Sequence, residues 1–203
     1  MSFSKLIDDL KGALKKKSTK VAITDMTNHA RAFSEAVDNY VKKLQDPAKR
    51  PPMTTMPMLM IPLIIPVSSA PGTKSVSADA LKSATSYASA VSAYAAAIII
   101  NPSPVMLLLG GIITPPGNVI NAKLIDLGIM ASIQNDFKEI FSADAEGEEE
   151  IIMTQKAVKM ANAIKKAFTQ KTNVIISGMD SSLPPPAGIG PQSFSITGPL
   201  KEN

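Results

Sequence analysis

The chain has 203 residues, the size of one domain with a single core. It contains no cysteine, which excludes disulfides, thiolate chemistry and cysteine-based metal sites. Its net charge of +4 is modest, and no basic stripe with interleaved aromatic residues indicates a direct nucleic-acid interface.

The N-terminal part is predicted to form two helices. Residues 3–16 place Phe3, Leu6 and Leu10 on one face, as in an amphipathic helix that docks on a neighbouring helix or, alternatively, anchors on a membrane surface. Residues 24–44 form a second helix, which Asp46-Pro47 ends. The apolar seam of this second helix consists of Met26, Ala30, Phe33, Val37, Tyr40 and Leu44.

Two long stretches carry no charged side chain: residues 51–73 and residues 83–122. Each either meets a membrane or is buried against protein. In the first, prolines recur every few residues and forbid a continuous helix, which would also leave backbone groups unsatisfied in hydrocarbon. We therefore expect residues 51–73 to form an extended apolar arm that lies against protein.

A third helix is predicted to begin at Ser77 as its N-cap and to present a face of small Ala and Ser side chains. Asn101-Pro102 stops this helix, and Val105–Ile113 is either a strand or two turns of helix.

Two further helices complete the predicted body. The first covers residues 118–141, with Leu127, Met130, Ile133, Phe137 and Ile140 on one side. The second begins in the acidic run before Ile151 and ends at Lys171, with Met160, Ile164 and Phe168 inward. Residues 172–203 are predicted to be extended, with strand character at 174–176 and 194–196.

Together these patterns predict a mainly α fold, a helical bundle body with proline-rich extended apolar arms and short strand-like segments. The expected organisation is an amphipathic N-terminal helix over residues 1–20, a helical body over 21–171 with the extended apolar arm at 51–73, and an extended Pro/Gly-rich C-terminal tail over 172–203.

Catalytic patterns are missing from the sequence. His29 is the single histidine, and a lone histidine within a helix is typical of a surface or capped residue rather than of a catalytic base. The acidic run 144–150 lacks the alternating oxygen ligands of a calcium loop. We therefore expect no enzyme activity and no catalytic, cofactor-binding or metal-binding residue.

The chain resembles the minor structural proteins of tailed-phage virions. The resemblance rests on a short cysteine-free sequence, Ala/Ser-rich helices and the Pro/Gly-rich C-terminal run PPPAGIGPQSFSITGP. It concerns composition and layout over the whole chain and transfers no functional residue. It implies a place in the neck, tail or baseplate of a virion that is assembled in the host cytoplasm.

The function expected is that of a non-enzymatic structural or assembly protein, a subunit of a large symmetric complex. Its partners would be copies of itself, as a homo-oligomer, and other structural proteins, and no cofactor is implied. Deleting residues 172–203 is expected to leave soluble helical protein that no longer assembles. The residues expected at interaction surfaces are Met58, Leu59, Ile61, Leu63, Ile64, Ile65, Ile98, Ile99, Leu107, Leu108, Phe194 and Ile196.

The alternative is a membrane-active or pore-forming protein, located in a membrane, that inserts the 83–122 segment. Residues 87–113 are numerous enough to span a bilayer, but Pro102 and Pro104 divide them into two shorter pieces.

Overall fold

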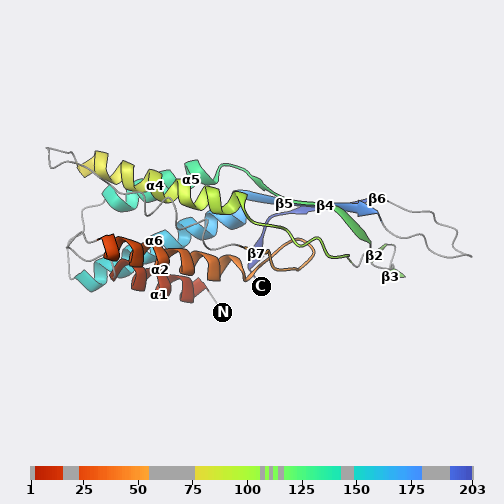
Figure 1. Cartoon of the computed structure of the whole chain (residues 1–203), viewed down its shortest axis with the longest axis horizontal. Helices are drawn as coiled ribbons and strands as arrows, with labels where there is room; N and C mark the ends of the chain where they lie inside the picture. The colour runs from red at the N-terminus through yellow and green to blue at the C-terminus, as the bar shows by residue number, and fades with distance from the viewer. Residues whose placement is uncertain are drawn as a thin grey trace, which may run out of the picture.

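The computed structural model describes residues 3–15, 23–54, 76–105, 108–109, 112–113, 117–142, 149–179 and 193–202. Its helices are α1 (Phe3–Lys15), α2 (Ile23–Val41), α4 (Val76–Ala96), α5 (Ile129–Ser142) and α6 (Glu149–Gln170). Its strands are β1 (Leu44–Gln45), β2 (Leu108–Leu109), β3 (Ile112–Ile113), β4 (Asn118–Asp126), β5 (Thr172–Met179), β6 (Ser193–Gly198) and β7 (Lys201–Glu202). The helices gather at one end of an elongated molecule, and the strands lie towards the other end (Figure 1).

The fold is mixed α/β, so the predicted mainly α class is wrong. Among the described residues, β4, β5 and β6 form an antiparallel sheet in that order, and β1–β7 and β2–β3 form two-stranded pairs. The first source of the error is residues 118–126, which belong to a strand and not to the start of a helix. The second is the C-terminal region, whose strand-like segments are paired within the chain.

α1 docks on α2 and α6 through its apolar stripe. Leu6, Leu10 and Ala13 are buried, because spacings of four and three residues place them on one face. The prediction of a docked amphipathic helix is confirmed. The predicted α2 seam is also buried at Ala30, Phe33, Val37, Tyr40 and Leu44, although the helix ends at Val41 and Leu44 lies in β1.

Aromatic side chains join the helices at the centre of the bundle. The Phe33 ring of α2 and the Tyr87 ring of α4 meet edge to face, with centroids 4.9 Å apart. Phe137 of α5 lies 5.3 Å from Tyr87 by the same measure. Tyr94 of α4 meets Phe168 of α6 at 6.0 Å. The Phe33–Tyr87 and Tyr94–Phe168 pairs meet edge to face and the Tyr87–Phe137 pair is tilted, and such pairs add specific contacts to the free energy gained by burying the rings.

The predicted helix over residues 118–141 is wrong in its first half. Residues 118–126 form β4, and α5 begins only at Ile129. Asp126 caps this helix: its Oδ1 accepts hydrogen bonds from the backbone N–H groups of Gly128 and Ile129, each at 2.7 Å. Gly128 has a φ of 107°, a left-handed conformation that favours glycine.

The buried faces predicted for α5 and α6 from the spacing of their apolar residues differ in accuracy. In α5, Ile133, Phe137 and Ile140 are buried as predicted, but Leu127 and Met130, assigned to the same side, are exposed. Leu127 lies before the helix, and in its first turn Ile129 takes the buried position in place of Met130. In α6, Met160, Ile164 and Phe168 are fully buried, and the prediction is confirmed.

The three-stranded sheet has one face against the core and one towards solvent. On the core face, Ala122 of β4 lies opposite Ile176 of β5, which in turn lies opposite Ile196 of β6. On the outer face, Lys123 pairs with Ile175 and Ile175 with Thr197. Alternation of side chains along each strand produces the two faces, and it explains why buried and half-buried positions alternate along β5.

The C-terminal region folds back on its own chain. β5 lies between β4 and β6, and β7 pairs with β1 at the end of α2. Val174, Ile176 and Leu200 are fully buried in the core. Residues 172–203 are therefore part of the fold and not a separate tail. Their deletion would remove core side chains and the central strand of the sheet, so we no longer expect it to leave soluble helical protein.

Candidate assembly surfaces

The structure describes only part of the predicted interaction set. Ile98 is buried in the chain's own core, whereas the adjacent Ile99 is exposed. Phe194 and Ile196 are half-buried on the core face of β6. Leu108 lies in β2, and its side chain is outside the described part, as are Met58, Leu59, Ile61, Leu63, Ile64, Ile65 and Leu107.

Ile99 has an apolar neighbour that the sequence did not identify. Met53 and Ile99 form an antiparallel bridge in which each backbone N–H donates to the other's carbonyl, at 2.9 and 3.0 Å. Directly opposed residues of an antiparallel pair project to the same side. Met53 is 55% exposed and Ile99 is 56% exposed, so the bridge presents two apolar side chains to solvent.

The backbone that carries this pair is fixed by buried polar groups. Asp46 is buried and accepts hydrogen bonds from the backbone N–H of Arg50, at 2.9 Å, and from its Nε, at 3.1 Å. Arg50 Nη1 also donates to the Ser103 carbonyl at 2.5 Å. These bonds join the segment that precedes Met53 to the segment that follows Ile99, so the exposed pair is held in a defined place.

A second buried carboxylate fixes the same region from α2. Asp38 accepts hydrogen bonds from the hydroxyl groups of Thr54 and Tyr94 and pairs with Lys42 Nζ at 2.6 Å. Burial acts to raise the pKa of Asp38, but the bonds from Lys42, Thr54 and Tyr94 outweigh it and hold the pKa below its ordinary value. The carboxylate therefore stays ionised and serves as a structural acceptor.

The outer face of the sheet presents a second apolar feature. A bulge between Val119 and Asn121 leaves Ile120 without an opposite residue on β5, and its side chain is 72% exposed. Met179, at the end of β5, is 46% exposed. Polar side chains surround them on this face, including Asn118, Asn121, Ser177 and Ser193.

The two outer strands of the sheet differ in their exposed edges. β4 carries Lys123 and the bulge at Ile120, both of which hinder pairing with another chain. β6 has the sequence SFSITG, with no charge, no bulge in its pairing with β5 and no internal proline. Among the described residues, β6 pairs with β5 alone.

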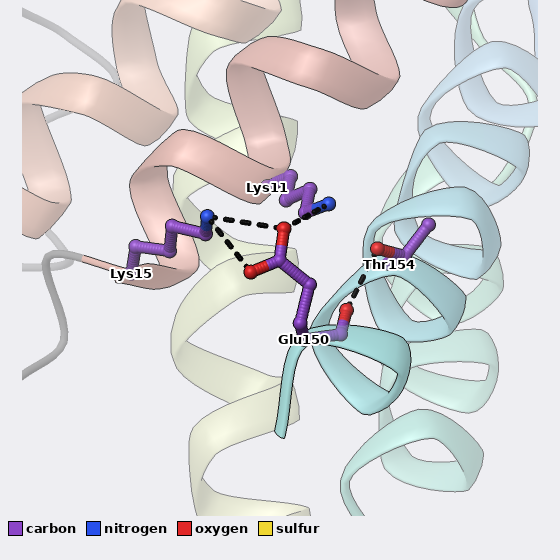
Figure 2. Close-up of polar contacts among 4 residues, drawn as sticks. All are labelled: Lys11, Lys15, Glu150 and Thr154. Carbon is purple, nitrogen blue, oxygen red and sulfur yellow. Dashed lines mark hydrogen bonds and ion pairs between the residues drawn. The ribbon is translucent and has the colours of Figure 1, made fainter. Parts of the chain in front are cut away.

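A charged cluster links α1 to the beginning of α6, as Figure 2 shows. Glu150 Oε1 lies 2.9 Å from Lys11 Nζ and 3.3 Å from Lys15 Nζ. Hydrogen bonds from these two lysines lower the pKa of Glu150. All three groups are at least partly exposed, so salt screens the pairs, and we assign the cluster to helix docking. The Thr154 hydroxyl bonds the Glu150 carbonyl within the same helix.

His29 is buried, and both ring nitrogens have partners. Nδ1 lies 2.7 Å from the Ala13 carbonyl oxygen, and Nε2 contacts the Tyr87 hydroxyl. A carbonyl oxygen only accepts, so Nδ1 carries a proton and donates it to the Ala13 carbonyl. His29 therefore joins α1, α2 and α4 from a buried position, so of the two expected alternatives, a surface or a capped residue, the surface one is wrong.

The described residues contain no group of three His, Asp or Glu side chains placed to hold a metal ion. An open groove of about 290 Å³ between α5 and α6 is lined by charged side chains, of which Asp136 and Lys166 pair with each other at 3.0 Å. Over the same described residues, no helix is long and apolar enough to cross a membrane.

Comparison of the chain with protein-family models, curated proteins and solved structures found no match.

Proposed function

We propose that this chain is a non-enzymatic structural protein that packs as a subunit of a large symmetric complex. The exposed Met53–Ile99 pair carries the proposal. Two apolar side chains held together at the surface gain free energy when another protein covers them. In the sequence, Met53 also lies within the charge-free stretch 51–73, which extends the apolar character of this region.

The molecule's shape supports a role as a subunit with several neighbours. The helical body and the sheet lie towards opposite ends of an elongated molecule (Figure 1). Exposed apolar side chains occur on the sheet as well, at Ile120 and Met179. Separate contact surfaces let one subunit touch more than one neighbour in a repeating assembly.

The proposed partners are copies of this chain and other structural proteins. We propose a tailed-phage virion as the assembly, with the chain in the neck, tail or baseplate. This part of the proposal rests on the resemblance in composition and layout described above.

Substitution of the exposed pair tests the proposal. Met53→Gln combined with Ile99→Gln removes the apolar side chains but keeps the bridge, whose hydrogen bonds are between backbone groups. We expect this double variant to have a lower mass by light scattering than the unsubstituted protein at equal concentration. The matched control is Leu81→Gln with Ile151→Gln, two exposed apolar residues on helices.

The control variant is expected to keep the mass of the unsubstituted protein. An equal loss of mass in both double variants would show general apolar adhesion and contradict the assignment to the Met53–Ile99 surface. Unchanged mass in both would contradict it as well.

A further inference from the structure

Among the residues that the structure describes, β6 pairs with β5 alone, and its other edge lacks the features that keep edge strands from pairing with other chains. Natural sheets protect such edges with charges, prolines or bulges. β4, at the other side of the same sheet, has Lys123 and the bulge at Ile120. β6 has none of these between Ser193 and Gly198. An unprotected edge offers its backbone N–H and carbonyl groups to a strand from another molecule.

We propose that β6 pairs antiparallel with β6 of a second copy, around a two-fold axis that passes beside Ser195. The inference rests on the proposed function, because it names one partner and one contact of the assembling subunit. It joins the two three-stranded sheets into one continuous six-stranded sheet.

The alternation of side chains along β6 restricts the register. Ser193, Ser195 and Thr197 are exposed, whereas Phe194 and Ile196 are half-buried on the core face. The two sheets keep matching faces only if exposed residues oppose exposed residues, which requires the axis to pass beside a residue and not between two. With the axis beside Ser195, the Ser195 residues of the two copies lie opposite each other. Ser193 of one copy then lies opposite Thr197 of the other, and Phe194 lies opposite Ile196.

These opposed pairs are favourable. Hydroxyl residues meet hydroxyl residues on the solvent face, and an aromatic ring meets a β-branched side chain on the core face. No charge opposes a like charge, because β6 has none. This self-complementarity is what favours a second copy over an unrelated partner.

An axis beside Ile196 is less favourable. It would oppose Phe194 of one copy to Gly198 of the other. Gly198 is already crowded by Pro47, whose Cγ would lie 3.2 Å from a Cβ added there. The axis beside Ser195 leaves Gly198 outside the paired region.

The β6 contact by itself is small. Five residues of strand edge on each copy bury less than the ~1,200 Å² at the lower end of stable protein interfaces. Such a contact becomes strong when it acts together with others in a repeating assembly. A test of the pairing must therefore trap it and not depend on its equilibrium strength.

The cysteine-free chain permits a direct cross-linking test on the full-length protein. In Ser195→Cys, the two thiols lie on opposed residues, whose Cα atoms in antiparallel pairs are about 4.5–5.5 Å apart, within disulfide range. In the control Ser193→Cys, the two thiols are four residues out of register, about 13 Å apart along the strand. Both positions are exposed serines on the same face of β6.

Under mild oxidation we expect severalfold more covalent dimer from Ser195→Cys than from Ser193→Cys on non-reducing gels. A mixture of Ser193→Cys with affinity-tagged Thr197→Cys is expected to give more mixed dimer than either gives of its own dimer. Equal cross-linking of Ser195→Cys and Ser193→Cys would overturn the proposed pairing.

The test separates failure of the pairing from failure of the proposed function. Multimers by light scattering with equal cross-linking of the two variants would overturn the β6 contact and leave the subunit role standing. Preferential Ser195 cross-linking in a chain that otherwise remains monomeric would support the pairing and contradict the large assembly.

Discussion

Glu202 of β7 accepts a hydrogen bond from the Tyr40 hydroxyl of α2 at 3.0 Å. Its other carboxylate oxygen lies 2.6 Å from Lys165 Nζ of α6, and this ammonium is 5.0 Å from the centroid of the Phe3 ring of α1. β7 is thus attached to three helices. Because Leu200 just before it is fully buried, this segment belongs to the core of the fold.

Leu200→Ala is expected to lower the free energy of unfolding by about 2–5 kcal/mol, the usual range for truncating a buried leucine. The control Lys201→Ala alters the adjacent exposed residue and is expected to change it by less than about 0.5 kcal/mol. Urea unfolding followed by circular dichroism measures both. Equal midpoints for the two variants would contradict the assignment of this segment to the core.

Asp38→Asn is expected to destabilise the protein at pH 7 by about 1–3 kcal/mol, because it replaces a buried, charge-assisted acceptor of three hydrogen bonds. The folded pKa of Asp38 lies below the unperturbed value of 3.8. The stability that its ionised form contributes is therefore complete above that value and is lost as the pH falls through the folded pKa.

Urea unfolding at pH 7 and at successively lower pH values below 4 measures this effect. The difference between the unsubstituted protein and Asp38→Asn is expected to shrink as the pH falls. Asp8→Asn makes the same chemical change at an exposed position on α1 and serves as the control. A difference for Asp38→Asn that is independent of pH would contradict the ionised state inferred here.

All three tyrosines are expected to resist ionisation in the folded protein. Burial raises the pKa of Tyr40, Tyr87 and Tyr94 well above the ordinary value of 10.0, and acceptance of their hydrogen bonds by Glu202 and Asp38 adds to the rise at Tyr40 and Tyr94. Stability linked to the neutral tyrosines is complete below pH 10 and is lost as the pH rises above it.

Absorbance of tyrosinate and circular dichroism should therefore change together in an alkaline titration. The expected result is one transition, above pH 10, in which helix is lost and tyrosinate appears. Ionisation of a tyrosine near its ordinary pKa while the helical signal remains intact would show that at least one ring is accessible to solvent.

Gly178→Ala is expected to destabilise the sheet strongly, by more than about 2 kcal/mol. A Cβ at position 178 would lie 2.0 Å from the Asn118 carbonyl oxygen and 2.8 Å from Phe194 Cζ, so the β4 backbone and the Phe194 ring would both have to move. The control Gly12→Ala has open space around it on α1 and is expected to stabilise the helix by about 0.5–1 kcal/mol. Thermal unfolding of both variants tests the close approach of the three strands.

The elements that could be predicted from the sequence are those with a local signal. α1 and α6 have regular helical spacing of Leu6 and Leu10, and of Met160 and Ile164, and both helices form where expected. β4 contains Ala122, Lys123 and Leu124, which are good helix formers. Local propensity therefore does not separate this strand from α5, and the predicted helix includes both. The aspartate and glycine at positions 126 and 128 were the available signal for a break between strand and helix.

Strand pairing had no comparable signal. The strand character of residues 174–176 and 194–196 could be recognised, but β5 pairs with β4 across the whole of α5 and α6. Tertiary packing, and not local propensity, determines which strand β5 pairs with. The same limit applies to the exposed pair: Ile99 was predicted at a surface, but its partner Met53 becomes visible only when the bridge between them is known.

Light scattering after size-exclusion chromatography measures the mass of the 203-residue chain without detergent, and the proposed subunit role depends on that mass. We expect a discrete multimer well above the 21.4 kDa of one chain, with a mass that rises with concentration towards a fixed value. A mass of one chain at every concentration, or protein recovered only with detergent, would contradict it.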